Sequence, residues 1–179
     1  TDGANLGSFG GGTIGHELTH GFDNSGAQYD AHGNVRNWWS EETAKNFESR
    51  SQCFIAQANN YLIKDVNLTV DGQQTLTENL ADQGGVKLGY LALEKLLANR
   101  PEGKTWNGFT ERQQYWIAYA QSWCTKSRPE ALKVQMASDP HPPAEFRVNG
   151  IMMNRPEFAK DFKCTSGQAM APVNRCSIW

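Results

Sequence analysis

The sequence predicts a mainly α-helical protein with few strands. Apolar residues recur at helical spacing, several segments open with residues typical of helix N-termini, and only one short stretch is rich in β-branched residues. The chain has 179 residues, of which 39% are hydrophobic and 20% charged. This length and composition predict one globular domain with a substantial core.

The first predicted helix spans about Gly11 to Phe22. Ile14, Leu18 and Phe22 are spaced four apart, so they form one stripe, which we expect to face the core. The segment 22–39 follows and is rich in Gly, Asn and Asp, which predicts turns or a short hairpin.

Further helices are predicted from their starts. Ser40 is a typical N-cap, Thr110 and Gln113 form a capping box, and proline is favoured in a first helical turn. A short strand or irregular excursion is expected between the second and third helices, and Arg100 and Pro101 should end the third. The predicted segments are about Ser40–Leu62, Thr77–Asn99, Thr110–Trp123, Pro129–Ala137 and Pro156–Phe162.

The charge balance argues against nucleic acid and anionic membranes as partners. The chain has 17 Lys and Arg against 19 Asp and Glu, a formal net charge of -2. Its apolar runs are far shorter than the roughly 18 residues that a transmembrane helix needs. The chain begins with Thr1 and has no leader-like segment, so we expect a piece of a longer or processed protein.

Four cysteines permit three complete pairings, which their number alone does not distinguish. They include no C-x-x-C pair, which weakens a zinc-ribbon or thioredoxin interpretation. Disulfides in an exported protein and buried free thiols both remain open at this level.

The first predicted helix contains His16-Glu17-Leu18-Thr19-His20, the H-E-x-x-H pattern. Residues four apart lie on one face of a helix, so His16 and His20 can bind one zinc ion while Glu17 is directed at a water on that ion. The alternative is a helix with two surface histidines and a solvated glutamate.

A catalytic zinc ion needs a third protein ligand and keeps one position for water. The metzincin extension would require Gly and His where this chain has Asp23 and Gly26, so that route is excluded. His32 and His141 lie in loop-like segments without helical spacing to the motif. A carboxylate is therefore the better candidate for the third ligand.

Glu78 and Asp82 lie four apart near the start of the helix predicted from Thr77. On one helix face they can supply one metal ligand and one acceptor that orients a zinc-bound histidine. The alternative is that Glu78 only favours a helix N-terminus and that Asp82 is solvated.

Four segments in order carry a family resemblance: HELTHGFDNSGAQYD, TENLADQGG, DPHPPAEFRVNG and the final CSIW. Together they resemble the catalytic C-terminal portion of the neprilysin and endothelin-converting enzyme family of zinc metallopeptidases, over nearly the whole chain. The resemblance implies that residues 1–179 are the C-terminal helical part of a thermolysin-like zincin (gluzincin) catalytic domain. The family's substrate-aligning sheet and capping domain would lie upstream.

The resemblance implies a zinc-dependent metalloendopeptidase with one Zn²⁺ per chain. His16, His20 and Glu78 match its metal ligands, and Glu17 matches its catalytic base. The family pattern has Ile where this chain has Leu80. The implied substrates are short peptides, cleaved on the amino side of hydrophobic residues.

The resemblance also implies three supporting roles. Asp82 matches the carboxylate that orients the first histidine, His141 a histidine that stabilises the transition state, and Arg147 an arginine that holds a substrate backbone carbonyl. The last two assignments rest mostly on the resemblance. Without it, the sequence predicts that His141 is a surface loop residue and that Arg147 is a solvated charge.

The resemblance further implies a disulfide between Cys53 and Cys176, whereas Cys124 and Cys164 resemble cysteines that pair with the N-terminal part of the protein. It places the protein outside the cytosol, whether secreted, periplasmic or membrane-anchored. Two alternatives stay open: a truncated zinc-binding module without efficient catalysis, and a helical interaction protein without metal.

Overall fold

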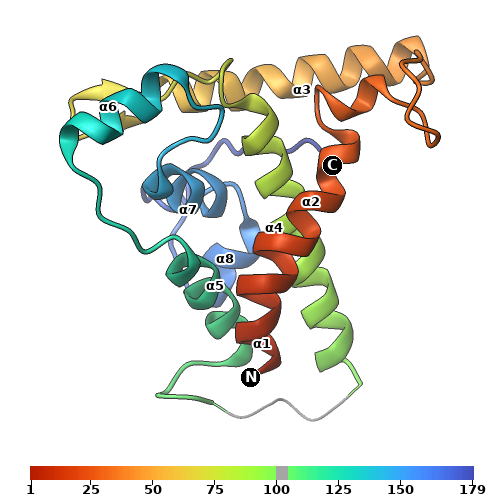
Figure 1. The fold of residues 1–179 in the computed structure, drawn as a ribbon. Coiled ribbons are helices and arrows are strands. Elements are labelled where there is room, and N and C mark those ends of the chain that lie inside the picture. The colour runs from red at the N-terminus through yellow and green to blue at the C-terminus, as the bar shows by residue number, and fades with distance from the viewer. Residues whose placement is uncertain (100–104) are drawn as a thin grey trace.

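The computed structural model describes residues 1–99 and 105–179, and this part of the chain is mainly helical, as predicted (Figure 1). α4 (Leu76–Leu97) packs along a helical stretch formed by the first residues of the chain, and α3 (Glu41–Asn59) lies across one end of both. α5 (Glu111–Ser122) contacts the same N-terminal stretch.

The N-terminal helical stretch, residues 2–22, is longer than predicted. It comprises α1 (Asp2–Asn5), a π-helical part (Leu6–Gly15), α2 (His16–Thr19) and a 3₁₀ turn (His20–Phe22). The prediction that it begins near Gly11 was wrong. The hydroxyl of Thr1 caps it by accepting a hydrogen bond from the backbone N–H of Ala4 at 3.3 Å.

A buried glycine stripe explains why this glycine-rich segment is helical. A Cβ on Gly7 would collide with the backbone carbonyl of Tyr115 in α5, and one on Gly15 would collide with the backbone of Gly85 in α4. The absence of side chains lets three helices approach closely, and this packing offsets the poor helix propensity of glycine. The stripe recurs every four residues and consists of Gly3, Gly7, Gly11 and Gly15.

Substituting this stripe should destabilise the fold. We expect Gly7→Ala to lower the free energy of unfolding by about 1–3 kcal/mol, because α5 must move away. Gly12→Ala is the matched control, since its nearest new contact would be an ordinary 3.5 Å to the Tyr119 ring. Chemical denaturation of both variants measures the difference, and equal stabilities would contradict the close packing.

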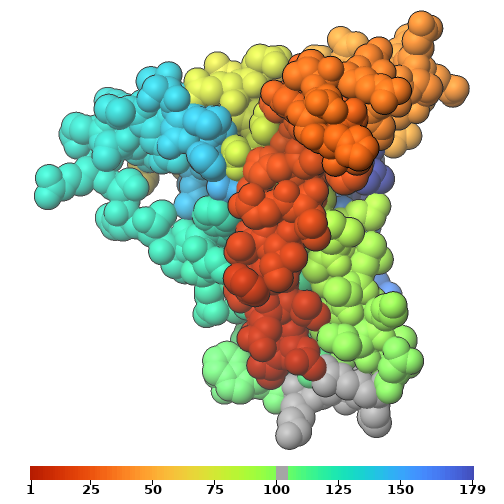
Figure 2. Space-filling view, turned by 45° about the vertical axis from the view of Figure 1, so that its right-hand side comes forward, coloured from red at the N-terminus to blue at the C-terminus, as the bar shows by residue number. Residues whose placement is uncertain are grey.

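The apolar stripe of the same stretch faces outward, contrary to prediction. Ile14, Leu18 and Phe22 are 48%, 63% and 51% exposed. Figure 2 shows residues 2–22 as a continuous band on the surface of the molecule. The glycine face takes the inner position because only it permits backbone contact with α4 and α5.

Most other helices start where the sequence predicts. Ser40 caps α3 through Thr43, the capping box opens α5, and prolines open α6 (Pro129–Ser138) and α8 (Pro156–Asp161). α3 ends at Asn59, before Leu62, because β1 (Leu62–Ile63) pairs antiparallel with β2 (Leu68–Thr69). The predicted terminators of α4, Arg100 and Pro101, lie outside the described residues.

α7 (Ala144–Met152) was not predicted. Asn149 and Gly150 weaken the local helix propensity, and the two prolines before Ala144 favour a loop when they are read alone. Burial stabilises the helix instead, since the Phe146 side chain is buried and its ring packs against Tyr61 at 5.0 Å between centroids.

The main core lies between α4, α5 and α7, around fully buried Leu93, Tyr119 and Ile151. The Cys53–Cys176 disulfide joins α3 to the C-terminal segment, as the resemblance implied, and Cys124 and Cys164 are free thiols. Within the described ranges, no helix is both long and apolar enough to cross a bilayer.

Candidate metal centre

Three side chains converge where the N-terminal helical stretch crosses the first turn of α4. The Nε2 atoms of His16 and His20 lie 3.0 Å apart. Glu78 Oε2 lies 3.3 Å from His16 Nε2, and Glu78 Oε1 lies 3.6 Å from His20 Nε2. One ligand atom from each residue falls within 4.8 Å of the others, as binding of a single metal ion requires.

Two buried carboxylates fix the tautomers of the two histidines. Asp82 lies 2.8 Å from His16 Nδ1, and Asp23 lies 2.6 Å from His20 Nδ1. A carboxylate accepts hydrogen bonds, so each Nδ1 carries the proton. When the imidazoles are neutral, both Nε2 lone pairs therefore point toward Glu78, which is the arrangement that a metal-binding histidine needs.

Asp23 is a further candidate site residue that the sequence did not point to, beyond excluding the metzincin extension. It follows His20 by three residues and also accepts the backbone N–H groups of Ser25 and Gly26, each at 2.8 Å. These bonds end the helical stretch and hold the carboxylate on His20. The position of a carboxylate three residues after the second histidine is the feature of the sequence that could have identified Asp23.

Asp23→Asn should weaken metal binding by about 10- to 100-fold, because an amide N–H₂ facing Nδ1 favours the wrong tautomer. Asp30→Asn is the matched control: Asp30 accepts backbone N–H groups from His32 and Asn34 in a similar turn, away from the histidine pair. Competition with a chelator of known zinc affinity compares them, and an unchanged affinity in Asp23→Asn would refute the tautomer argument.

The electrostatics of the centre favour a cation. Burial alone would lower the pKa of His16, but contacts with the Asp82 and Glu78 carboxylates outweigh it and raise that pKa to about 9. Burial acts to raise the pKa of Glu78, but His16 and the other two nearby histidines lower it overall. Among the described residues, buried Glu78 Oε2 has no hydrogen-bond partner. Two imidazole nitrogens and a carboxylate oxygen suit zinc.

His141 faces the same carboxylate from a loop before α7. Its Nε2 lies 3.3 Å from Glu78 Oε2, and its Nδ1 lies 2.8 Å from Asp139 Oδ1. The backbone N–H of His141 also donates to Asp139, and these two bonds lower the pKa of the Asp139 carboxyl. Asp139 thus orients His141, a role that the sequence analysis did not assign.

Arg147, on α7, binds Asp82 through two hydrogen bonds. Nε donates to Oδ2 and Nη2 to Oδ1, both at 2.7 Å, and the guanidinium is almost fully buried. Six of the seven expected site residues are thus brought together: His16, His20, Glu78, Asp82, His141 and Arg147. Glu17 follows His16 on α2 and is exposed.

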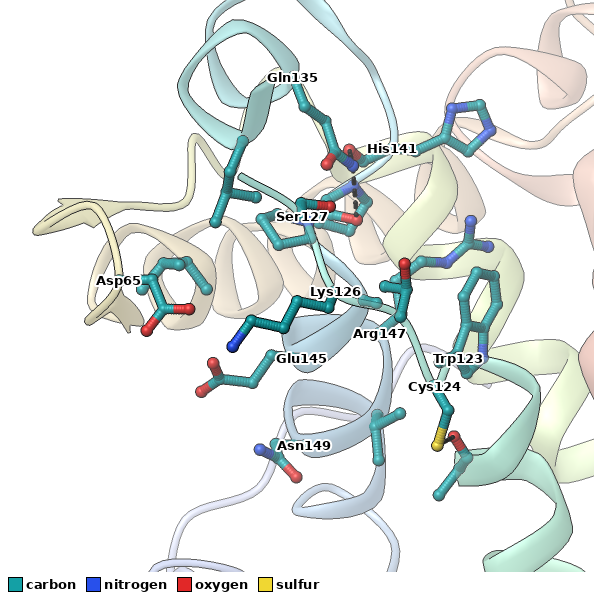
Figure 3. A pocket seen from close by; sticks show the side chains of 18 of the residues that line it. Asp65, Trp123, Cys124, Lys126, Ser127, Gln135, His141, Glu145, Arg147 and Asn149 are labelled. Carbon is teal, nitrogen blue, oxygen red and sulfur yellow. Dashed lines mark hydrogen bonds between the residues drawn. The ribbon is translucent and has the colours of Figure 1, made fainter. Parts of the chain in front are cut away.

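A cavity of about 830 Å³ opens beside the centre (Figure 3). Trp123, His141 and Arg147 line the end nearer the metal centre, and Asp65, Lys126 and Glu145 line the other end. The cavity therefore borders the centre through His141 and Arg147, and it is large enough for a peptide side chain.

Comparison with known proteins gives one consistent family. The sequence model that describes peptidase family M13 matches residues 1–178 of this chain. Neprilysin-2 of Drosophila melanogaster is 43% identical over 93% of this chain and 22% of its own length, and an endothelin-converting enzyme homolog of Locusta migratoria is 42% identical over 93% and 23%.

Solved structures agree with this family. The zinc metalloprotease Zmp1 of Mycobacterium tuberculosis, in complex with inhibitor, superposes with a TM-score of 0.94 at 36% identity, over 100% of this chain and 28% of that protein. PepO from Lactobacillus rhamnosis gives 0.82 at 35% identity, over 96% and 25%. The chain thus spans about a quarter or less of the length of the curated relatives it matches.

Proposed function

The chain belongs to peptidase family M13, and on that basis we propose that it carries the catalytic metal centre of a zinc-dependent metalloendopeptidase. The convergence of His16, His20 and Glu78, with both histidines held in the metal-binding tautomer, is the observation that supports this most strongly.

In this proposal His16, His20 and Glu78 hold one Zn²⁺ per chain, and Asp82 and Asp23 orient the two histidines. Bound zinc would polarise the scissile carbonyl and lower the pKa of the attacking water. The donor set fits this ion, and among the described residues Glu78 Oε2 accepts no hydrogen bond that the ion would have to replace.

Glu17 would act as the general base, taking the proton from the attacking water and passing it to the leaving amine. His141 would donate from Nε2 to the oxyanion that develops when its imidazole is protonated on both nitrogens, with its Nδ1–H held by Asp139. The exposure of Glu17 leaves its carboxylate open to a substrate.

Arg147 would hold a substrate backbone carbonyl. Among the described residues its hydrogen bonds to Asp82 use Nε and Nη2, which leaves Nη1 for a substrate. We propose short peptides as substrates, cleaved on the amino side of hydrophobic residues, with the cavity beside the centre receiving a substrate side chain.

We propose that the substrate-aligning sheet and the capping domain belong to the remainder of the peptidase. The exposed apolar stripe of Ile14, Leu18 and Phe22 supports a packing partner there. The same exposure favours a second candidate function for this chain alone, a zinc-binding module that does not cleave efficiently. The Cys53–Cys176 disulfide supports a location outside the cytosol.

Cleavage of a quenched short peptide, with a hydrophobic residue after the scissile bond, tests the enzyme proposal. Chelator-sensitive cleavage that returns with added zinc is the expected result. Zinc binding without cleavage would favour the module instead, and cleavage that chelators leave unchanged would contradict both.

A further inference from the structure

Arg147 is part of a chain of contacts that ends on a metal ligand. Its guanidinium holds both oxygens of Asp82, and Asp82 in turn holds Nδ1 of His16. A bidentate pair fixes the plane as well as the position of a carboxylate. The orientation of His16 therefore depends on where the guanidinium lies.

Trp123, at the C-terminal end of α5, supports that guanidinium from the side. Arg147 Cζ lies 4.0 Å from the centroid of the Trp123 ring, a distance typical of a cation–π contact (Figure 3). The indole is itself packed edge-on against fully buried Tyr119, with the ring centroids 6.4 Å apart. The Trp123 ring is thus held in place by Tyr119 and packs against the long Arg147 side chain.

The cavity makes this support necessary. Both Trp123 and Arg147 line the space of about 830 Å³, so the Arg147 side chain borders open space on one side. An arginine side chain regains rotamer entropy by moving into such a space. The aromatic face opposes this because it attracts the cation in a partly desolvated place.

We propose that Trp123 is a positioning residue for the metal centre: its aromatic face keeps Arg147 on Asp82, and thereby keeps His16 oriented for metal binding. The inference rests on the proposed zinc function. In this arrangement Trp123 acts on the metal centre through Arg147, and that property can be tested separately from a general packing role.

The test measures the zinc dissociation constant of the 179-residue chain by chelator competition. Trp123→Leu should weaken zinc binding about 3- to 30-fold, the range of a partly buried cation–π contact. Trp123→Phe should fall between parent and Trp123→Leu, because phenylalanine offers a weaker aromatic face. Trp106→Leu is the matched control, since Trp106 is 59% exposed and lies outside the centre.

A double-mutant cycle with Arg147→Met distinguishes positioning from packing. In the Arg147→Met background, Trp123→Leu should leave the zinc affinity unchanged, because the cation it supports is gone. A similar loss in both backgrounds would overturn the proposal, as would parent affinity in Trp123→Leu. If Trp123→Leu does not fold, the same cycle with Trp123→Phe decides. A parent chain that binds no zinc would refute the proposed function itself.

Discussion

Glu78→Val abolishes stoichiometric zinc binding if Glu78 is the third metal ligand. Apparent zinc-binding free energies in proteins are about 10–16 kcal/mol over four ligands, so losing one ligand should weaken binding about a hundred- to a thousandfold. The effect should be large here because the lost carboxylate faces both His16 and His20. Zinc content after dialysis against a weak chelator measures it.

Glu130→Val provides the control for this prediction. Glu130 occupies the first turn of α6, as Glu78 does in α4, but it is exposed. A carboxylate that merely favours a helix N-terminus would give both variants the same small loss of stability and the same zinc content. Equal zinc in Glu78→Val and the parent would therefore remove Glu78 from the ligand set.

Glu17→Gln should separate metal binding from catalysis. The substitution preserves shape and leaves His16, His20 and Glu78 intact, so zinc content should equal that of the parent. Turnover should fall about 10²- to 10⁴-fold, the usual contribution of a general acid–base residue. Zinc content and cleavage of a quenched peptide are measured on the same preparations.

Near-normal turnover in Glu17→Gln would show that another group takes the proton. Loss of zinc together with turnover would show instead that Glu17 supports the ligand residues structurally. The exposed position of Glu17, without a role in the core, predicts that the variant folds like the parent.

The candidate metal centre was predictable because helical spacing brings its residues together. His16 and His20, and likewise Glu78 and Asp82, are four apart on helices whose existence the sequence predicts. His141 and Arg147 were predicted mostly from the family resemblance. They come from a loop and a helix whose local sequence lacks a clear period, so long-range packing determines their positions.

The orientation of the N-terminal helical stretch was not predictable from hydrophobicity. The rule that apolar residues face the core failed for Ile14, Leu18 and Phe22, because backbone contact through Gly7 and Gly15 needs the opposite face. The spacing of the glycines, four residues apart, can be read from the sequence. Whether that face is buried depends on which helices pack against it, and the sequence does not show this. The contacts of Asp23 and Asp139 with the histidines were not predicted for a similar reason. A carboxylate close to a histidine in sequence orients that histidine only if its side chain points toward the ring.

X-ray absorption at the zinc edge, combined with zinc content per chain, reports on the ligand set of His16, His20 and Glu78. We expect one zinc per chain, bound by nitrogen and oxygen ligands at about 2.0–2.2 Å with no sulfur. A chain without zinc, or a zinc with sulfur at about 2.3 Å from the free thiols of Cys124 or Cys164, would contradict this expectation.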